Sequence, residues 1–108
     1  MNPVPMRGHV YRVDLGGVGL KPYVIVSNNV RNRKLNSALG VRITTTDKNA
    51  IPTAVRLTNA DPLAGFALAD DIIEIYEEEI ASADYLGSLS PGTIMALDRA
   101  LAQALGLP

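Results

Sequence analysis

The chain has 108 residues and a formal net charge of −1 at pH 7, with 47% hydrophobic and 19% charged residues. This composition is typical of one folded domain, here residues 1–108, and not of a disordered chain. Because there is no cysteine and only one histidine, a disulfide scaffold, a thiolate zinc site and a cysteine nucleophile are excluded.

The hydropathy pattern contains no segment that would direct the chain to a membrane. The longest aliphatic stretch is only a few residues long, around Val24-Ile25-Val26, far short of a membrane span. The first six residues, Met1 to Met6, lack the apolar region of a signal peptide. We therefore expect a small, soluble, cytoplasmic protein that does not bind a membrane.

The near-zero net charge hides a strong asymmetry between the two halves. Residues 1–58 carry nine Lys and Arg against two acids, a net of +7, whereas residues 59–108 carry one Arg against nine acids, a net of −8. This split favours a basic surface for an anionic partner. Mutual neutralisation of the two halves within the fold is the alternative, and charge alone does not decide between them.

Strand patterns dominate the first three quarters of the chain. Residues 11–15 alternate apolar and polar side chains, and Gly16-Gly17-Val18-Gly19 then marks a short connection. Residues 22–27 are apolar on both faces, which predicts a central strand. The polar and basic residues 28–36 predict a loop with at most one helical turn. Further strands are predicted at residues 39–46, 53–57 and 66–75.

The end of the chain predicts one helix. Ser90 is a suitable N-cap, Pro91 fits the first helical position, and Gly106 suits the C-terminal stop. An apolar stripe recurs every three or four residues, formed by Ile94, Leu97, Leu101 and Leu105. The acidic run at 77–79 predicts a short exposed turn. The expected architecture is mostly β, a small bent antiparallel barrel with a C-terminal helix.

Motifs for cofactors and metals are weak. The segment Gly16-Gly17-Val18-Gly19 lacks the Gly-Lys-Ser/Thr ending of a phosphate loop. Asp70 and Asp71 point to opposite faces of an alternating strand, which favours a solvated acidic edge over a cation site. His9 has no local partner. We therefore expect no metal site and no cofactor.

Residues 21–46 contain a stronger constellation. Arg42, Thr44 and Thr46 share one strand face by the two-residue period, and Lys21 precedes the central strand after the glycine-rich loop. A guanidinium, two hydroxyls and a flexible ammonium together suit a phosphate. The alternative is that the threonines are ordinary β-branched strand residues and Lys21 is a solvated lysine. The residue pattern leaves both interpretations open.

Several short motifs occur in a characteristic order. They are Arg7-Gly8-His9-Val10-Tyr11, Asp14-Leu15, Lys21-Pro22-Tyr23-Val24-Ile25-Val26-Ser27-Asn28, Ile43-Thr44-Thr45, Ile51-Pro52-Thr53, Asp70-Asp71-Ile72, and Leu86-Gly87 before the capped helix. In this order and spacing the sequence resembles the MazF/PemK family of bacterial toxins over nearly its whole length. The resemblance implies a small SH3-like antiparallel barrel of the CcdB/MazF type.

The resemblance also implies an activity. It suggests the toxin of a type II toxin–antitoxin system, a sequence-specific endoribonuclease that blocks translation and growth. Such enzymes cleave single-stranded RNA without a metal by attack of the 2′-hydroxyl, and leave a 2′,3′-cyclic phosphate and a 5′-hydroxyl end. Lys21 and Thr44 occupy the positions of the family's catalytic arginine and threonine. The expected RNA-binding residues are Arg31, Arg33, Arg42, Thr46 and Lys48.

The expected partners follow from the same resemblance. They are single-stranded RNA (mRNA, with tRNA and rRNA as further classes), a cognate antitoxin, and a second copy of the chain in a homodimer. Two departures from the family pattern matter: Lys21 replaces the arginine, and the loop from Gly16 to Leu20 is short.

Two alternatives stay open. One is a non-catalytic family member that only binds RNA or the antitoxin, because Lys21 replaces the arginine. The other is a CcdB-like gyrase inhibitor. That class relies on a C-terminal tryptophan, and this chain contains no tryptophan.

Overall fold

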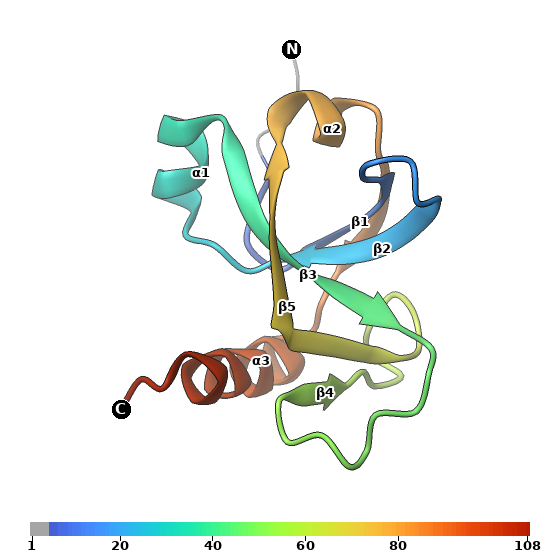
Figure 1. Cartoon of the computed structure of the whole chain (residues 1–108), viewed down its shortest axis with the longest axis vertical. Helices are drawn as coiled ribbons and strands as arrows, with labels where there is room; N and C mark the ends of the chain where they lie inside the picture. The colour runs from blue at the N-terminus through green and yellow to red at the C-terminus, as the bar shows by residue number, and fades with distance from the viewer. Residues whose placement is uncertain (1–4) are drawn as a thin grey trace.

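The computed structural model describes residues 5–108; the segment Met1 to Val4, which the sequence analysis included in the domain and examined for a signal peptide, lies outside the described residues. Six strands form one antiparallel sheet in the order β4-β5-β3-β2-β1-β6 (Figure 1). The strands are β1 His9–Asp14, β2 Leu20–Ile25, β3 Ser37–Thr44, β4 Ala54–Arg56, β5 Phe66–Tyr76 and β6 Asp84–Ser88. The helices are α1 Asn29–Leu35, α2 Glu77–Ala81 and α3 Pro91–Leu105.

The predicted fold class, mostly β with a C-terminal helix, is confirmed, but the sheet does not close into a barrel. Within residues 5–108, β4 and β6 end the strand order and no ladder joins them. The sheet is strongly bent because the long strand β5 changes register against β3 between Val41 and Ile43. One end of β5 pairs with β4 and the other continues along β3 (Figure 1).

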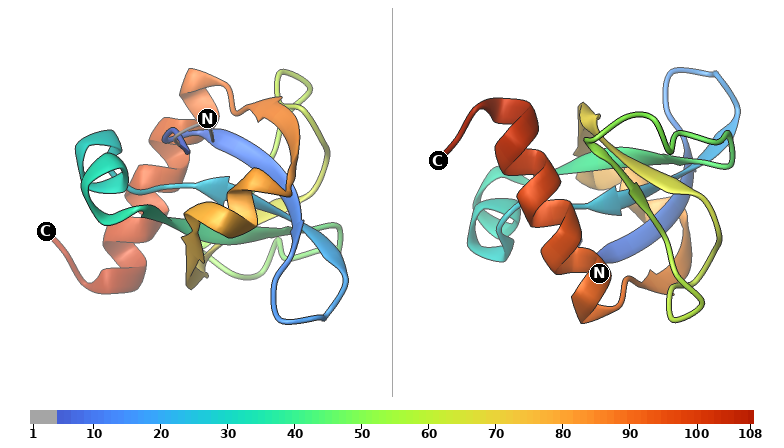
Figure 2. Two further views of the ribbon diagram at one scale, coloured as in Figure 1. Left: turned by 90° about the horizontal axis from the view of Figure 1, so that it is seen from above. Right: turned by 90° about the horizontal axis from the view of Figure 1, so that it is seen from below.

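The bent sheet has an apolar core on each face. Helix α3 covers the first face, where its Leu97 joins Val24 of β2 and Val41 of β3, and Figure 2 shows this helix lying across the sheet. The second core contains Tyr11, Tyr23 and other residues from β1, β2, β3 and β5, together with Ile80 of α2. Side chains that alternate along β2 and β3 therefore belong to different cores.

The structure corrects several predicted boundaries. Residues 28–36 form helix α1 instead of a loop, because the Asn28 side chain accepts hydrogen bonds from the backbone of Val30 and Arg31 and caps the helix. Strand β3 begins and ends two residues before the predicted range 39–46. The acidic run 77–79 opens helix α2, and the sequence analysis missed β6.

Helix α3 is confirmed at both ends. The Ser90 hydroxyl caps its first turn, and Gly106 adopts the left-handed conformation at its C-terminus. The predicted apolar stripe is wrong in its last member, because Leu105 is exposed while Leu97 is buried. The helix packs on the sheet along most of its length, through Leu97, Leu101 and Ala104, and its last residue, Leu105, points to solvent.

Asp61 anchors the beginning of α3 to the loop after β4. Its carboxylate accepts hydrogen bonds from the Ser90 backbone nitrogen at 2.7 Å, the Thr93 hydroxyl at 2.7 Å and the Thr58 backbone nitrogen at 2.7 Å. Burial opposes the ionisation of Asp61, but these hydrogen bonds outweigh it and hold the pKa of the carboxyl below its ordinary value. The ionised form therefore stabilises the fold.

We expect Asp61→Asn to lower the free energy of unfolding at pH 7 by about 1–2 kcal/mol, since the carboxylate is partly exposed. A lowered folded-state pKa gives stabilisation that is present above the unfolded-state value of about 4 and is lost as pH falls through the folded-state value. Urea unfolding of both proteins across this range measures the difference, which should shrink in acid. Asp84→Asn, at an exposed position, is the control. A difference that is constant from pH 7 to pH 3 would contradict the role of the charge.

Candidate functional site

The catalytic pair suggested by the resemblance lies where β2 and β3 separate. The antiparallel register pairs Ile25 with Gly40 and Tyr23 with Arg42. Continued by one step of two residues, it places Lys21 opposite Thr44 and on the same face of the sheet. This step lies just beyond the last paired residues, at the end of β3 where the two strands diverge (Figure 1). Both side chains are partly exposed.

The Thr44 hydroxyl is held in place and remains free to donate. Its oxygen accepts a hydrogen bond from the backbone nitrogen of Thr46 at 3.2 Å. This contact uses a lone pair and leaves the hydroxyl proton available for an anion. The Thr46 side chain itself is exposed in the loop after β3.

Arg42 contributes an unpaired donor to the same face. Its Nε is buried and has no hydrogen-bond partner among the described residues. A buried donor without a partner is costly, so the position favours an anionic ligand. Burial raises the pKa of the neighbouring Tyr23 hydroxyl; the Arg42 charge opposes this effect, and the charges of Asp71 and Asp14 reinforce it.

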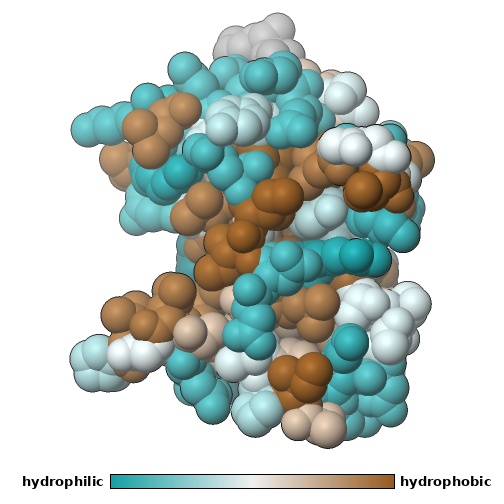
Figure 3. Space-filling view, in the orientation of Figure 1, coloured by the Kyte–Doolittle hydropathy of each residue, from teal (hydrophilic) through white to brown (hydrophobic). Residues whose placement is uncertain are grey.

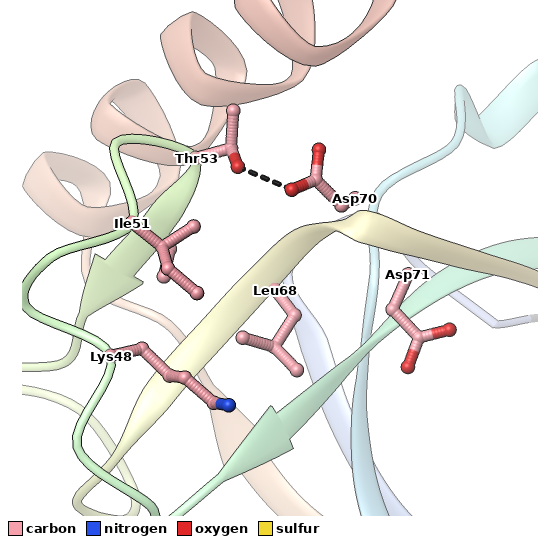
Figure 4. A pocket seen from close by; sticks show the side chains of 7 residues that line it. Lys48, Ile51, Thr53, Leu68, Asp70 and Asp71 are labelled. Carbon is pink, nitrogen blue, oxygen red and sulfur yellow. Dashed lines mark hydrogen bonds between the residues drawn. The ribbon is translucent and has the colours of Figure 1, made fainter.

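A cavity of about 350 Å³ adjoins this cluster (Figure 4). It is lined by Lys48, Ile51, Thr53, Ala54, Leu68, Asp70 and Asp71. The Thr53 hydroxyl donates to the Asp70 carboxylate at 2.6 Å and fixes one of its oxygens. The cavity lies over β4, β5 and the loop after β3, and β5 pairs with β3, the strand that carries Arg42 and Thr44.

The sequence analysis missed this cavity. It interpreted Asp70 and Asp71 as a solvated acidic edge, and both are exposed in the structure, but they also line the cavity. The two adjacent acids in the middle of a mainly apolar strand were the available signal. Within residues 5–108, no group of three or more His, Cys, Asp or Glu residues is arranged to hold a metal ion.

The structure brings together only some of the predicted RNA-binding residues. Lys48 lines the cavity, and Arg42 lies two residues before Thr44 on β3. Arg31 and Arg33 lie on α1, next to the opposite end of β3, about 23 Å from Thr44 at the usual rise of a strand.

Arg31 is engaged within the fold. Its guanidinium donates to the Ser37 carbonyl oxygen at 3.0 Å and lies 3.6 Å from the Glu74 carboxylate. Hydrogen bonds from Ser37 and Tyr76, together with the Arg31 charge, lower the pKa of Glu74. These contacts tie α1 to β3 and β5. Arg33, by contrast, is exposed.

Within residues 5–108, no helix has the length and apolar character that a membrane crossing requires.

Residues 6–105 match the family described as the PemK-like, MazF-like toxin of type II toxin–antitoxin systems. Endoribonuclease MazF4 of Mycobacterium tuberculosis is 49% identical over 104 residues, which cover 96% of this chain and 95% of that protein.

Two solved structures agree with these similarities. A mycobacterial endoribonuclease superimposes with a TM-score of 0.88 at 45% identity, over 100% of this chain and 97% of that one. A mycobacterial endoribonuclease in complex with its cognate antitoxin gives a TM-score of 0.89 at 49% identity, over 96% and 97% of the two chains.

Proposed function

This chain belongs to the PemK-like, MazF-like family of type II toxin–antitoxin toxins, and on that premise we propose that its endoribonuclease centre is the Lys21–Arg42–Thr44 face. The protein is a MazF-type endoribonuclease toxin. The observation that supports this placement of the centre is the β2–β3 register, which pairs Tyr23 with Arg42 and, continued by two residues, aligns Lys21 with Thr44. The Nε of Arg42 beside them is buried without a hydrogen-bond partner among the described residues.

The reaction is proposed to be an internal transfer within the RNA. The substrate's 2′-oxygen forms a bond to the adjacent phosphorus, and the bond from phosphorus to the 5′-oxygen breaks. The products are a 2′,3′-cyclic phosphate and a 5′-hydroxyl end. Because the nucleophile belongs to the RNA, the enzyme's tasks are to align the groups, to move protons and to stabilise added negative charge.

Each residue of the face suits one of these tasks. The amine of Lys21 takes the proton from the 2′-hydroxyl, and its ammonium form supplies a proton to the departing 5′-oxygen. The Thr44 hydroxyl donates to a non-bridging phosphate oxygen. Arg42 holds the phosphate through its guanidinium, whose planar geometry matches phosphate oxygens. Thr46 and Lys48 extend this polar surface and would contact the nucleotides next to the cleaved phosphate.

Analysis of the RNA ends tests this function. Purified protein is incubated with a mixed pool of single-stranded RNA in EDTA, and the ends are mapped. Cleavage should persist, leave a cyclic phosphate and a 5′-hydroxyl, and stop when a 2′-deoxynucleotide occupies the cut site. Ends that carry a 5′-phosphate would contradict the 2′-hydroxyl mechanism. Binding of RNA with no cleavage at all would favour the non-catalytic alternative.

We propose that a cognate antitoxin neutralises the protein through an acidic segment. The structure of a related mycobacterial endoribonuclease in complex with its cognate antitoxin has been solved. The first half of this chain carries a net charge of +7, which suits an acidic segment that orders on binding. Such a segment would compete with RNA for the basic surface. Co-expression with the protein of the adjacent reading frame tests this pairing.

We also propose that the chain forms a homodimer through the middle of β5. Ile72 and Ile73 are 36% and 37% exposed, and Figure 3 shows hydrophobic surface over β5 between α1 and α3. The exposed Leu35 of α1 and Leu105 of α3 extend this apolar surface. A second copy of the same chain would cover it by self-complementary packing.

We expect Ile72→Asp to convert the dimer into a monomer at micromolar concentration, because a carboxylate would be buried at the centre of the contact. Sedimentation equilibrium measures the mass. Val18→Asp is the matched control, since Val18 is also an exposed aliphatic residue but lies in the β1–β2 loop. A wild-type protein that is monomeric under these conditions would contradict the proposal.

A further inference from the structure

Three of the four tyrosines of this chain form a row across neighbouring strands. Tyr85 of β6 lies opposite Tyr11 of β1, and Tyr11 lies opposite Tyr23 of β2. Tyr23 in turn lies opposite Arg42 of β3. Directly opposed residues share a face of the sheet, so this row runs from the sheet edge at β6 to the proposed phosphate-binding guanidinium.

The outer end of the row is an open cluster of rings. The ring centroid of Tyr85 lies 5.0 Å from that of His9 and 5.6 Å from that of Tyr11. Tyr85 is 55% exposed, although Tyr11 beneath it is buried. The Tyr85 hydroxyl lies within hydrogen-bond distance of the Ser88 hydroxyl, at 3.1 Å, which limits rotation of the ring. We call His9, Tyr11 and Tyr85 the aromatic platform.

The platform has the properties of a surface for a planar, uncharged ligand. Burial lowers the pKa of His9, so its ring is neutral near pH 7. Burial, reinforced by the neighbouring Tyr85, raises the pKa of the Tyr11 hydroxyl. Their tilted packing holds the Tyr85 ring in a fixed orientation with more than half of its area open.

We propose that the aromatic platform is a stacking subsite for one unpaired base of the RNA substrate, an assignment that rests on the proposed function. Every nucleobase has a π-face, and single-stranded nucleic acids are commonly bound by stacking on exposed aromatic rings beside a basic groove. The subsite therefore holds a base with little preference for its identity.

The distance from the platform to the proposed centre supports this assignment. Tyr85 and Lys21 are separated by two strand spacings across the sheet and by one two-residue step along it. These steps amount to about 12 Å between their Cα atoms. A short stretch of single-stranded RNA covers this distance, so a base near the cleaved phosphate reaches the platform while the phosphate contacts Lys21 and Arg42.

The test measures binding and cleavage separately. Binding uses a fluorescent RNA oligonucleotide that contains the mapped cut site with a 2′-deoxynucleotide there, so that it cannot be cleaved. Tyr85→Ala should weaken binding about tenfold or more, within the range for loss of one stacked base. Tyr85→Phe, which retains the ring, should bind within about twofold of wild type. Single-turnover cleavage by Tyr85→Ala should need correspondingly more enzyme to reach half of its maximal rate.

The matched control is Tyr76→Ala. Tyr76 is 49% exposed but lies at the end of β5, outside the aromatic row, so RNA binding should not change. Tyr85→Leu provides a second variant that keeps apolar bulk without a π-face and should weaken binding as Tyr85→Ala does. Circular dichroism confirms that each variant is folded.

Abasic nucleotides locate the stacked base. One abasic nucleotide at a time is placed on either side of the cut. At one position it should weaken binding to the wild-type protein about tenfold, and at that same position it should cause no further loss of binding to Tyr85→Ala. Such non-additivity identifies a direct contact.

If Tyr85→Ala binds the oligonucleotide as tightly as wild type, the subsite does not exist. If this variant loses only antitoxin binding, the platform belongs to the partner protein and the proposal is overturned. If the wild-type protein cleaves no RNA, the proposed function is contradicted. In that case the binding of a mixed-sequence oligonucleotide to wild type and to Tyr85→Ala would still show whether the platform binds a base.

Discussion

Replacing Lys21 with alanine is expected to slow RNA cleavage by two to four orders of magnitude, roughly the contribution of a general acid or base. The β2–β3 register, continued by two residues, aligns Lys21 with Thr44 and sets it beside Arg42, and Lys21 is the member of this cluster whose nitrogen can both take and give a proton. Single-turnover rates at saturating enzyme isolate the chemical step from binding. Alanine in place of Lys21 should reduce this rate far more than it weakens binding.

Two further variants make this prediction specific. Lys21→Arg retains the charge but hardly ever releases a proton. This variant also installs the arginine that the family resemblance implies at this position, so retained activity would show that the positive charge matters more than proton transfer. A loss as large as that of Lys21→Ala would show that the lysine itself must transfer the proton. Arg99→Ala is the matched control, because Arg99 is an exposed cation on α3, the helix that covers the other face of the sheet. A wild-type rate for Lys21→Ala would show that the centre lies elsewhere.

Replacing Thr44 with valine is expected to slow cleavage on the order of a hundredfold, as for the loss of one donor to a developing oxyanion. Valine preserves the shape and β-branching of threonine but removes the hydroxyl, whose oxygen accepts from the Thr46 backbone nitrogen. The strand should therefore form normally while the donor to the phosphate is lost. Thr44→Ser should recover most of the rate.

The neighbouring threonine supplies the control for Thr44. Thr45 follows directly in the chain, just beyond the end of β3, is exposed, and is not part of the proposed centre. Thr45→Val should therefore cleave RNA within about twofold of wild type. Equal losses at Thr44 and Thr45 would indicate a general effect on the loop instead of a specific hydrogen bond.

Features that depend on neighbours in the sequence were predictable. The cap at Ser90, the proline that follows it and Gly106 define α3 from local chemistry alone. The apolar pattern along the chain likewise located β1, β2 and β5 to within a few residues, by alternation in β1 and by apolar residues on both faces in β2. The family resemblance implied Lys21 and Thr44 as the catalytic pair, and this assignment stays a prediction, because the β2–β3 pairing ends two residues before it.

Short elements were not predictable in the same way. Helix α2 has five residues, and Ile80, buried against the second core, is what fixes it in place. Strand β6 contains only a weak apolar pattern and forms because β1 offers it a free edge. Helices and strands this short gain too little from local interactions to form alone, so their sequences carry little signal.

The sequence by itself determined the fold class, the long helix, most strands and the family. Tertiary structure alone decided that Thr53 would fix the carboxylate of Asp70, that the Nε of Arg42 would be buried without a partner, and that Tyr85 would complete a row with Tyr11. The reason is physical: capping and periodicity act within a few residues, whereas these contacts depend on strand register. Register is set by the burial of two whole faces of a bent sheet, and no local segment of the chain specifies it.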